Sequence, residues 1–311
     1  MLQTANKKIS ARQRRYDLTG WLFCLPAVVF GAVFLIAPIL LSFTFSFTDY
    51  HMLRGLHAFV GFENYVELFS DAVFGKAIVN TVKFVVFVVP LQCGLALLLA
   101  LLVNRTAKGF GVFKLAYFAP VITSMTVVAL LFMNFYDANG LFNLLLGTVG
   151  IDAQGFLHDP RQAMYSIIFM SVWQGAGYQM IILLAALQNV QPELYEAAGL
   201  DGANGWQKFR HVTLPGILSV GSFVLLITLI GAFKLFTQPY IMTQGGPDNS
   251  TMTVVLYIYE RGMTDKLIGY GSAIAMLFTF AFILASAIGK GGSRGVAIYR
   301  RRRDRYIEEM I

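Results

Sequence analysis

The sequence is poor in charged residues and in cysteine. Of its 311 residues, 13% are charged and 57% are hydrophobic. Soluble domains carry about 25% charged and about 45–50% apolar residues, so the composition favours a chain that is embedded in lipid. The only two cysteines, Cys24 and Cys93, both lie inside apolar runs. We interpret them as small apolar side chains rather than as a disulfide framework or a metal site.

Acidic residues are absent from the long apolar segments. A helix needs about 20 mostly apolar residues to cross a bilayer, and the sequence therefore predicts an all-α integral membrane protein with six transmembrane helices. Only two basic residues, Lys83 and Lys234, lie well inside these segments, and we expect Lys83 to extend toward the outer interface. The predicted segments are roughly 20–47, 77–103, 114–136, 163–188, 214–237 and 269–290.

Lysine and arginine gather on alternate loops. With the N-terminus inside, 17 of them fall in cytoplasmic segments and 5 in outer segments. Cytoplasmic loops carry an excess of these residues, so we place both termini in the cytoplasm and expect an uncleaved first helix. The predicted organisation is a cytoplasmic segment over 1–19, a membrane domain over 20–290 and a basic cytoplasmic tail over 291–311. We expect the tail to pair with anionic headgroups rather than with nucleic acid.

The sequence also lacks an obvious source of energy or a catalytic centre. No intramembrane carboxylate suggests a proton or sodium relay, and no G-x-x-x-x-G-K-[ST] P-loop occurs. The four histidines lie outside the apolar segments at unrelated spacing. His51 and His57 share one outer loop, where a solvated surface is the preferred interpretation over a metal site. We predict a protein that is not an enzyme and binds no metal or cofactor itself. A self-contained secondary transporter for a polar solute is the alternative function.

The inner loop over 189–213 predicts two short helices joined by a glycine turn. Pro192 suits a first helical position, where the missing N–H is not needed. Gly202 can end that helix with a positive φ. Asn204 can then cap a second helix, with Gln207 three residues further on, as in a capping box.

The second of these helices carries an aromatic face. Trp206, Phe209 and Val212 recur at helical spacing and therefore share one side. Such a hairpin either rests on lipid as an interfacial amphipathic pair or transmits force from a cytoplasmic partner. The pattern alone leaves both interpretations open.

The same loop resembles the EAA loop of ABC importer permeases, written EAA-x3-G-x9-I-x-LP. Two further stretches extend the resemblance: GFENYVELF over 61–69, and TQGGPDNST over 243–251. The second is similar to the TGGGP-x-x-ST stretch of the maltose- and glycerol-phosphate-type subgroup, in which this chain resembles the first permease of a heterodimeric pair. Phe132 and Thr237 depart from the residues common in relatives, so substrate identity is not carried over. The matching loop residues are Glu196, Ala197, Ala198, Gly202, Val212 in place of Ile, Leu214 and Pro215.

This resemblance implies the six-helix core of a type I ABC importer in the bacterial cytoplasmic membrane. Two permease subunits would enclose the pathway, and two ATPase subunits carrying ATP and magnesium would bind the EAA loops. An extracytoplasmic binding protein would deliver a sugar or related polar solute. The residues expected to couple to the ATPase are Glu196, Ala197, Ala198, Gly202, Trp206, Phe209, Leu214 and Pro215.

The fourth apolar segment contains the most polar, glycine-broken stretch of any span. Transporter sites lie near the bilayer midplane, beside helix breaks and polar groups, and amide and aromatic side chains suit a hydroxylated solute. Equally, Gly175 and Gly177 could serve close helix packing while Gln174 bonds a neighbouring helix. Lys234 could contact an anionic solute. The candidate pathway residues are Asn134, Trp173, Gln174, Tyr178, Gln179, Lys234 and Gln238.

Overall fold

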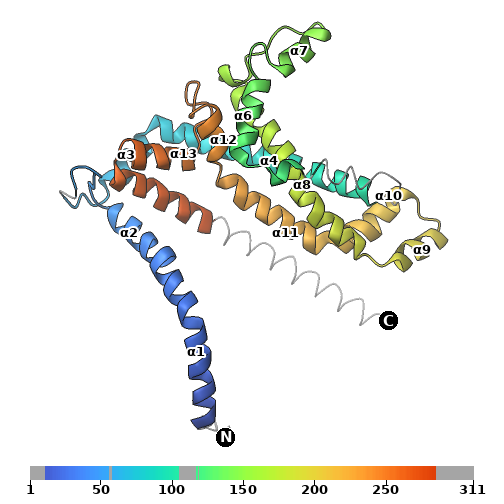
Figure 1. Cartoon of the computed structure of the whole chain (residues 1–311), viewed down its shortest axis with the longest axis horizontal. Helices are drawn as coiled ribbons and strands as arrows, with labels where there is room; N and C mark the ends of the chain where they lie inside the picture. Colours follow the sequence, from blue (N-terminus) through green and yellow to red (C-terminus); the bar gives the residue numbers. More distant parts are fainter. Residues whose placement is uncertain (1–10, 56–57, 105–116, 118, 285–311) are drawn as a thin grey trace, which may run out of the picture. The chain divides into compact units, whose positions relative to one another are not determined.

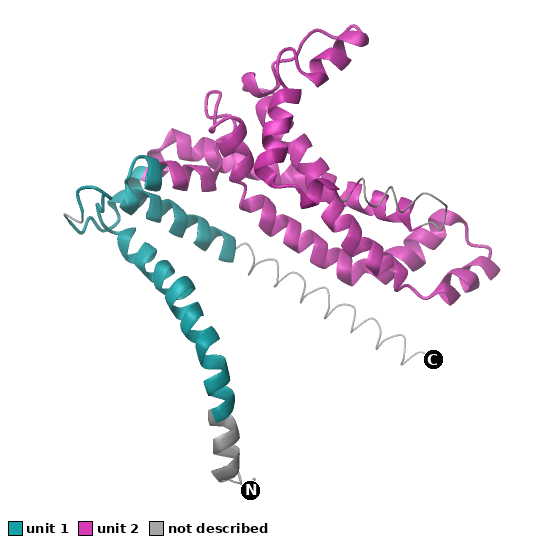
Figure 2. Cartoon of the chain, in the orientation of Figure 1, with its two compact units in different colours: residues 1–67, 261–311 teal, residues 68–260 magenta. Residues whose placement is uncertain are grey.

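The computed structural model describes residues 11–55, 58–104, 117 and 119–284, and every regular element in these ranges is helical, apart from isolated β-bridges (Figure 1). The predicted tail over 291–311 and the start of the N-terminal segment lie outside the described residues. The chain forms two compact units, one of residues 1–67 with 261–311 and one of residues 68–260 (Figure 2).

The first unit begins with a long apolar helix. Helix α1 (Ala11–Gly31) continues through a π-helical turn, η1 (Ala32–Ile36), into α2 (Ala37–Phe45). Most side chains from Thr19 to Phe45 are exposed although the segment is strongly apolar. An apolar helix without a polar face is typical of a membrane span.

A compact loop follows this helix and is held by α3 (Glu63–Ser70). The Asn64 amide donates to the carbonyls of Ser46 and Thr48, both at 2.9 Å, and the Tyr65 hydroxyl donates to the Ser46 hydroxyl at 2.8 Å. The asparagine and tyrosine of the 61–69 stretch therefore have a structural role in fixing the loop.

The last described segments of the first unit pack on the same loop. The π-helical turn η4 (Glu260–Thr264) leads to an apolar helix, Ile268–Leu284. The Gly269 N–H donates to the Tyr50 carbonyl at 2.9 Å. A Cβ at Gly269 would collide with the Thr48 carbonyl oxygen, so this close approach requires glycine.

Three long helices form the body of the second unit. They are α4 (Ala72–Val103), α8 (Ala163–Gln188) and α11 (Leu214–Phe233), and each packs against the other two. Asp71 begins α4 because its carboxylate accepts the Val73 and Phe74 N–H groups at 2.8 and 3.1 Å, a standard N-cap. Two clusters of buried apolar side chains lie between these helices, one toward each end of α8.

Shorter helices surround the end of the second unit at which α4 and α8 begin. They are α6 (Met125–Phe135), α7 (Leu141–Thr148), the 3-10 turn η2 (Phe156–His158), α12 (Thr237–Met242) and α13 (Val254–Tyr259). The loop over 243–251 is fastened to α4. The Asn80 amide donates to the carbonyls of Asn249 and Met252 at 2.8 and 2.9 Å, and the Val254 N–H donates to the Thr81 hydroxyl at 3.0 Å.

Four helices of the described chain are long and apolar enough to span a membrane: Thr19–Phe45, Ala72–Val103, Ala163–Gln188 and Gly205–Met242. The other two predicted segments contain the shorter apolar helices Met125–Phe135 and Ile268–Leu284. All-helical architecture is thus confirmed, with one apolar helix in each predicted segment.

Two predicted spans are interrupted. The third has a break at Thr123 and Ser124, where the backbone of Ser124 is extended. The fifth has a break at Leu235 and Phe236, between α11 and α12. The Leu235 carbonyl accepts the Thr253 hydroxyl at 2.8 Å, and Pro239 has no N–H to donate to it. The predicted span to Thr237 did not anticipate this break, because Thr237 begins the separate helix α12.

Candidate functional site

The loop over 189–213 forms a capped helical hairpin. Helix α9 (Pro192–Leu200) has Pro192 in its first turn, and Gly202 follows it with φ of 75°. The Gln207 N–H donates to the Asn204 side chain at 3.0 Å, and the Asn204 N–H donates to the Gln207 side chain at 2.8 Å. The predicted proline position, glycine turn and capping box are confirmed.

The second helix of the hairpin is not a separate element. Helix α10 (Gly205–Lys208) passes through a π-helical turn, η3 (Phe209–Thr213), directly into α11. Pro215 lies in the first turn of α11, directly after the π-helical turn. It has no N–H to donate to the preceding turn, and a π-helical turn beside a proline is a common place for a helix to bend without ending. The hairpin is consequently continuous with the wall of the helix bundle.

The hairpin presents apolar side chains to its surroundings. Leu200 is 92% exposed and Trp206 is 67% exposed, and the Trp206 and Phe209 rings lie 5.5 Å apart. Glu196 is exposed on α9. A hydrogen bond of 3.0 Å between the Tyr195 and Thr213 hydroxyls holds α9 against η3. An exposed apolar surface on a rigid element is suited to binding a partner.

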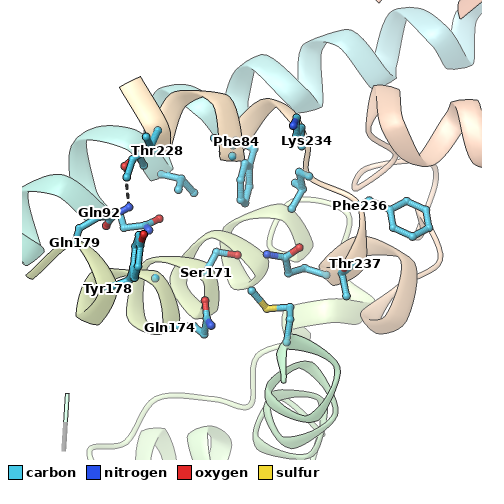
Figure 3. Close-up of a pocket in the computed structure, with 18 of the residues that line it drawn as sticks. Phe84, Gln92, Ser171, Gln174, Tyr178, Gln179, Thr228, Lys234, Phe236 and Thr237 are labelled. Atoms are coloured by element: carbon cyan, nitrogen blue, oxygen red, sulfur yellow. Dashed lines mark hydrogen bonds between the residues drawn. The ribbon is translucent and has the colours of Figure 1, made fainter. Parts of the chain in front are cut away.

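A second candidate site is a cavity of about 400 Å³ between α4, α8, α11 and α12. Figure 3 shows polar side chains from these helices around the same space. Its polar and charged lining residues are Gln92, Ser171, Gln174, Tyr178, Gln179, Thr228, Lys234, Thr237 and Gln238.

Two buried oxygen atoms in the lining of this cavity have no hydrogen-bond partner among the described residues. Gln179 is 4% exposed, and its amide N–H donates to the Thr228 hydroxyl at 2.7 Å (Figure 3), but its carbonyl oxygen has no partner. The hydroxyl of Ser171, which is 5% exposed, has none either. Buried polar groups are nearly always paired, so these two atoms are exceptions in the cavity lining, and both are themselves shielded from solvent.

Residues 21–291 match the family described as "Binding-protein-dependent transport system inner membrane component". The chain belongs to this family. The lactose transport system permease protein LacF of Rhizobium radiobacter is 39% identical over 81% of this chain and 85% of that protein. The arabinooligosaccharides transport system permease protein AraP of Bacillus subtilis is 34% identical over 86% of each.

A solved structure has the same fold as this family member. It is a chain of a bacterial ABC transporter involved in the import of the acidic polysaccharide alginate. The likeness has a TM-score of 0.81 at 24% identity and covers 91% of this chain and 97% of that chain. By its family and by these relatives, the chain is a membrane permease of the binding-protein-dependent ABC type.

The permease brings most of the predicted pathway residues together. Gln174, Tyr178, Gln179, Lys234 and Gln238 all line the cavity. Asn134 and Trp173 do not. Asn134 lines a different cavity of about 660 Å³ and bonds the Leu130 carbonyl at 2.8 Å, while the Trp173 ring packs 5.3 Å from the Phe132 ring.

The glycines of α8 allow neighbouring segments to pack closely against it, as the helix-packing interpretation of Gly175 and Gly177 predicts. A Cβ at Gly175 would collide with the Gln92 amide, and one at Gly177 would collide with the Tyr117 carbonyl. Gln174 approaches the Pro120 carbonyl at 3.5 Å, which is a long hydrogen bond. The same stretch of α8 therefore provides both the close contacts between helices and the polar lining of the cavity.

Besides Thr237 at the end of the predicted fifth span, sequence reasoning missed three polar lining residues, namely Gln92, Ser171 and Thr228. Each is a polar side chain inside an otherwise apolar span, which was the available signal. It also missed an aromatic cluster at the end of α11. The Phe236 and Tyr240 rings stack at 5.1 Å, and Tyr259 lies 5.3 Å from Tyr240. Hydrogen bonding to Tyr240 raises the pKa of Tyr259.

Proposed function

We propose that this permease is one of two membrane subunits of an ATP-driven importer that moves a sugar or related polar solute into the cytoplasm by alternating access. The family match over residues 21–291 carries the proposal. The relatives named above are described as permeases for lactose and for arabinooligosaccharides, which supports a carbohydrate as the solute. A neutral sugar, an oligosaccharide and a phosphorylated polyol all fit this class.

The proposed topology has six transmembrane helices and both termini in the cytoplasm of a bacterium, as a multi-pass protein of the inner membrane. The excess of lysine and arginine on alternate loops supports this orientation. With it, the hairpin over 189–213 faces the cytoplasm, and α7, η2 and α13 lie toward the outer face.

The proposed role of the hairpin is to bind an ATPase subunit. Exposed Glu196, the turn at Gly202 and the Trp206/Phe209 face support this role, together with the EAA spacing. Because α10 runs into α11 without a break, a displacement at the hairpin is transmitted along a helix that lines the cavity. ATP and magnesium would be bound by the ATPase chains.

The proposed substrate pathway passes through the cavity lined by Gln174, Tyr178 and Gln179. A movement of the cavity wall that exposes the buried Gln179 and Ser171 oxygens would let solute hydroxyls donate to them. The Tyr178 ring, 52% exposed, offers an apolar face for a sugar ring. Lys234 and Gln238 lie at the end of the cavity nearest α12.

The proposed assembly contains a second, different permease, two ATPase subunits and an extracytoplasmic solute-binding protein. Affinity purification of the tagged full-length chain in mild detergent, with mass spectrometry of the co-purifying chains, tests it. We expect a second six-helix permease and a P-loop ATPase. A chain that purifies alone and still catalyses uptake without ATP would support the secondary-transporter alternative instead.

A further inference from the structure

An apolar groove of about 550 Å³ lies in the second unit, away from the cavity just described. It is formed by α7, η2, the start of α8 and the residue that follows α6. Most of its surface is aromatic or aliphatic. The lining residues are Tyr136, Phe142, Leu145, Leu146, Gln154, Phe156, Gln162, Tyr165, Ser166 and Phe169.

The side chains of Gln154, Gln162 and Ser166 in the groove are already bonded within the protein. The Gln162 side chain donates to the Gln154 side chain at 2.9 Å and accepts the Phe156 N–H at 2.9 Å. The Ser166 hydroxyl donates to the Gln162 carbonyl at 3.2 Å, and the Ser166 carbonyl accepts the Tyr136 hydroxyl at 2.8 Å. Unlike the cavity with its unpartnered Gln179 oxygen, the groove is therefore suited to an apolar occupant.

A positively charged side chain lies at the edge of the groove. The Lys83 ammonium lies 4.0 Å from the centroid of the Tyr165 ring, and Tyr165 lines the groove. The one ion pair found among the described residues joins two other side chains. The half-buried Lys83 ammonium is therefore available to donate to a group of opposite charge beside Tyr165.

This edge lies on a different side of α4 from the polar cavity. Phe84, Val88 and Gln92 line the cavity at intervals of four residues. Lys83 precedes Phe84 by one residue, which places it about 100° around the helix. Phe87, 40% exposed, shares the Lys83 side and packs edge-on against Tyr165 at 5.6 Å.

The neighbouring helix α7 has the composition of an interfacial element. Leu144 is 63% exposed and Leu145 is 54% exposed, although α7 is almost wholly apolar. Asn143 anchors it by donating to the carbonyls of Asp137 and Gln154, both at 3.1 Å. Exposed leucines on an anchored helix at the end of a span, with tyrosines beside them, are typical of the membrane interface.

We propose that the groove is a binding site for an anionic phospholipid. An acyl chain occupies the space between Phe142, Leu146 and Phe169, and the headgroup phosphate pairs with the Lys83 ammonium over the Tyr165 ring. The charge of Lys83 and the apolar lining together select this occupant, because a bilayer supplies both an alkyl chain and a phosphate at that depth.

Native mass spectrometry of the full-length chain with phosphatidylglycerol or phosphatidylcholine tests the site. We expect the wild type to retain phosphatidylglycerol about fivefold better than phosphatidylcholine, in line with one basic contact to an anionic headgroup. Lys83→Gln should abolish that preference. Lys76→Gln is the matched control, because Lys76 lies on the same helix but donates to the Asp248 carbonyl at 3.3 Å, and it should keep the preference.

A second variant tests the groove itself. Leu146→Trp fills it and should lower retention of both lipids. Equal retention of the two lipids by the wild type, or an unchanged preference in Lys83→Gln, would overturn the proposal. So would a specific loss of a co-purifying permease from both Lys83→Gln and Leu146→Trp, since the groove would then be a protein interface.

Discussion

Gln179 on α8 donates its side-chain N–H to the hydroxyl of Thr228 on α11 at 2.7 Å. Thr228 in turn donates to the Val224 carbonyl at 2.7 Å, so this chain of bonds is directional. The donor side of the Gln179 amide is engaged by it, while the carbonyl oxygen is buried and has no partner among the described residues. A solute hydroxyl is the kind of group that could bind this acceptor once a movement of α8 or α11 exposes it.

Gln179→Met should weaken uptake while leaving the protein folded. Methionine has similar volume and removes both the bond to Thr228 and the acceptor. Loss of one such bond corresponds to about 0.5–1.5 kcal/mol, so we expect KM for uptake to rise about two- to twelvefold. Uptake kinetics of a labelled sugar in vesicles would measure it. Gln188→Met, an exposed change at the other end of α8, is the control and should leave KM unchanged.

Glu196→Ala or Gly202→Asp should uncouple ATP hydrolysis from transport while membrane insertion stays normal. The first removes an exposed carboxylate from the hairpin, and the second places a side chain at a φ of 75°, which glycine adopts most readily. Parallel assays of uptake and ATPase activity would reveal this. Glu193→Ala changes a carboxylate in the first turn of the same helix and should remain coupled. Wild-type uptake by both test variants would contradict the docking role.

Gly177→Ala and Gly94→Ala should shift stability in opposite directions. A Cβ at Gly177 meets the Tyr117 carbonyl, whereas a Cβ at Gly94 meets nothing within 4 Å. Overpacking costs about 1–3 kcal/mol, while alanine in an open helical position gains about 0.5–1 kcal/mol over glycine. Thermal unfolding of the two purified variants in one detergent compares them directly. Equal midpoints would show that α8 does not approach Tyr117 this closely.

Thr81→Val should weaken the attachment of the segment before α13 to helix α4. The buried Val254 N–H loses its acceptor at 3.0 Å, which costs about 1–3 kcal/mol. We expect faster proteolysis near residues 243–254. Mass spectrometry of the fragments would measure it. Thr81→Ser keeps the hydroxyl and should behave like the wild type.

Local chemistry made the hairpin predictable from the sequence. Pro192, Gly202 and the Asn204/Gln207 pair each act on neighbouring backbone atoms, so spacing alone was sufficient. The second helix was harder, because its continuation into α11 depends on a π-helical turn for which residues 209–213 carry no distinctive signal.

The cavity was only partly predictable, because its lining comes from several separate helices. Polar residues inside apolar spans identified Gln174 and Gln179, and the same criterion applied to α4 and α11 would have added Gln92 and Thr228. Which side of a helix a residue occupies depends on packing between helices. This is why Asn134 and Trp173 were grouped with the cavity although they lie elsewhere.

The continuous helical path from α10 through η3 into α11 also relates the size of a movement at the hairpin to its size at the cavity. Trp206 and Thr228 are 22 residues apart on one helical path, or about 33 Å at about 1.5 Å per residue. A tilt of about 10° pivoting near Thr228 would sweep Trp206 through an arc of about 6 Å on that length, while the cavity wall at the pivot would scarcely move. Large displacements of the hairpin therefore correspond to small displacements around the Gln179–Thr228 bond.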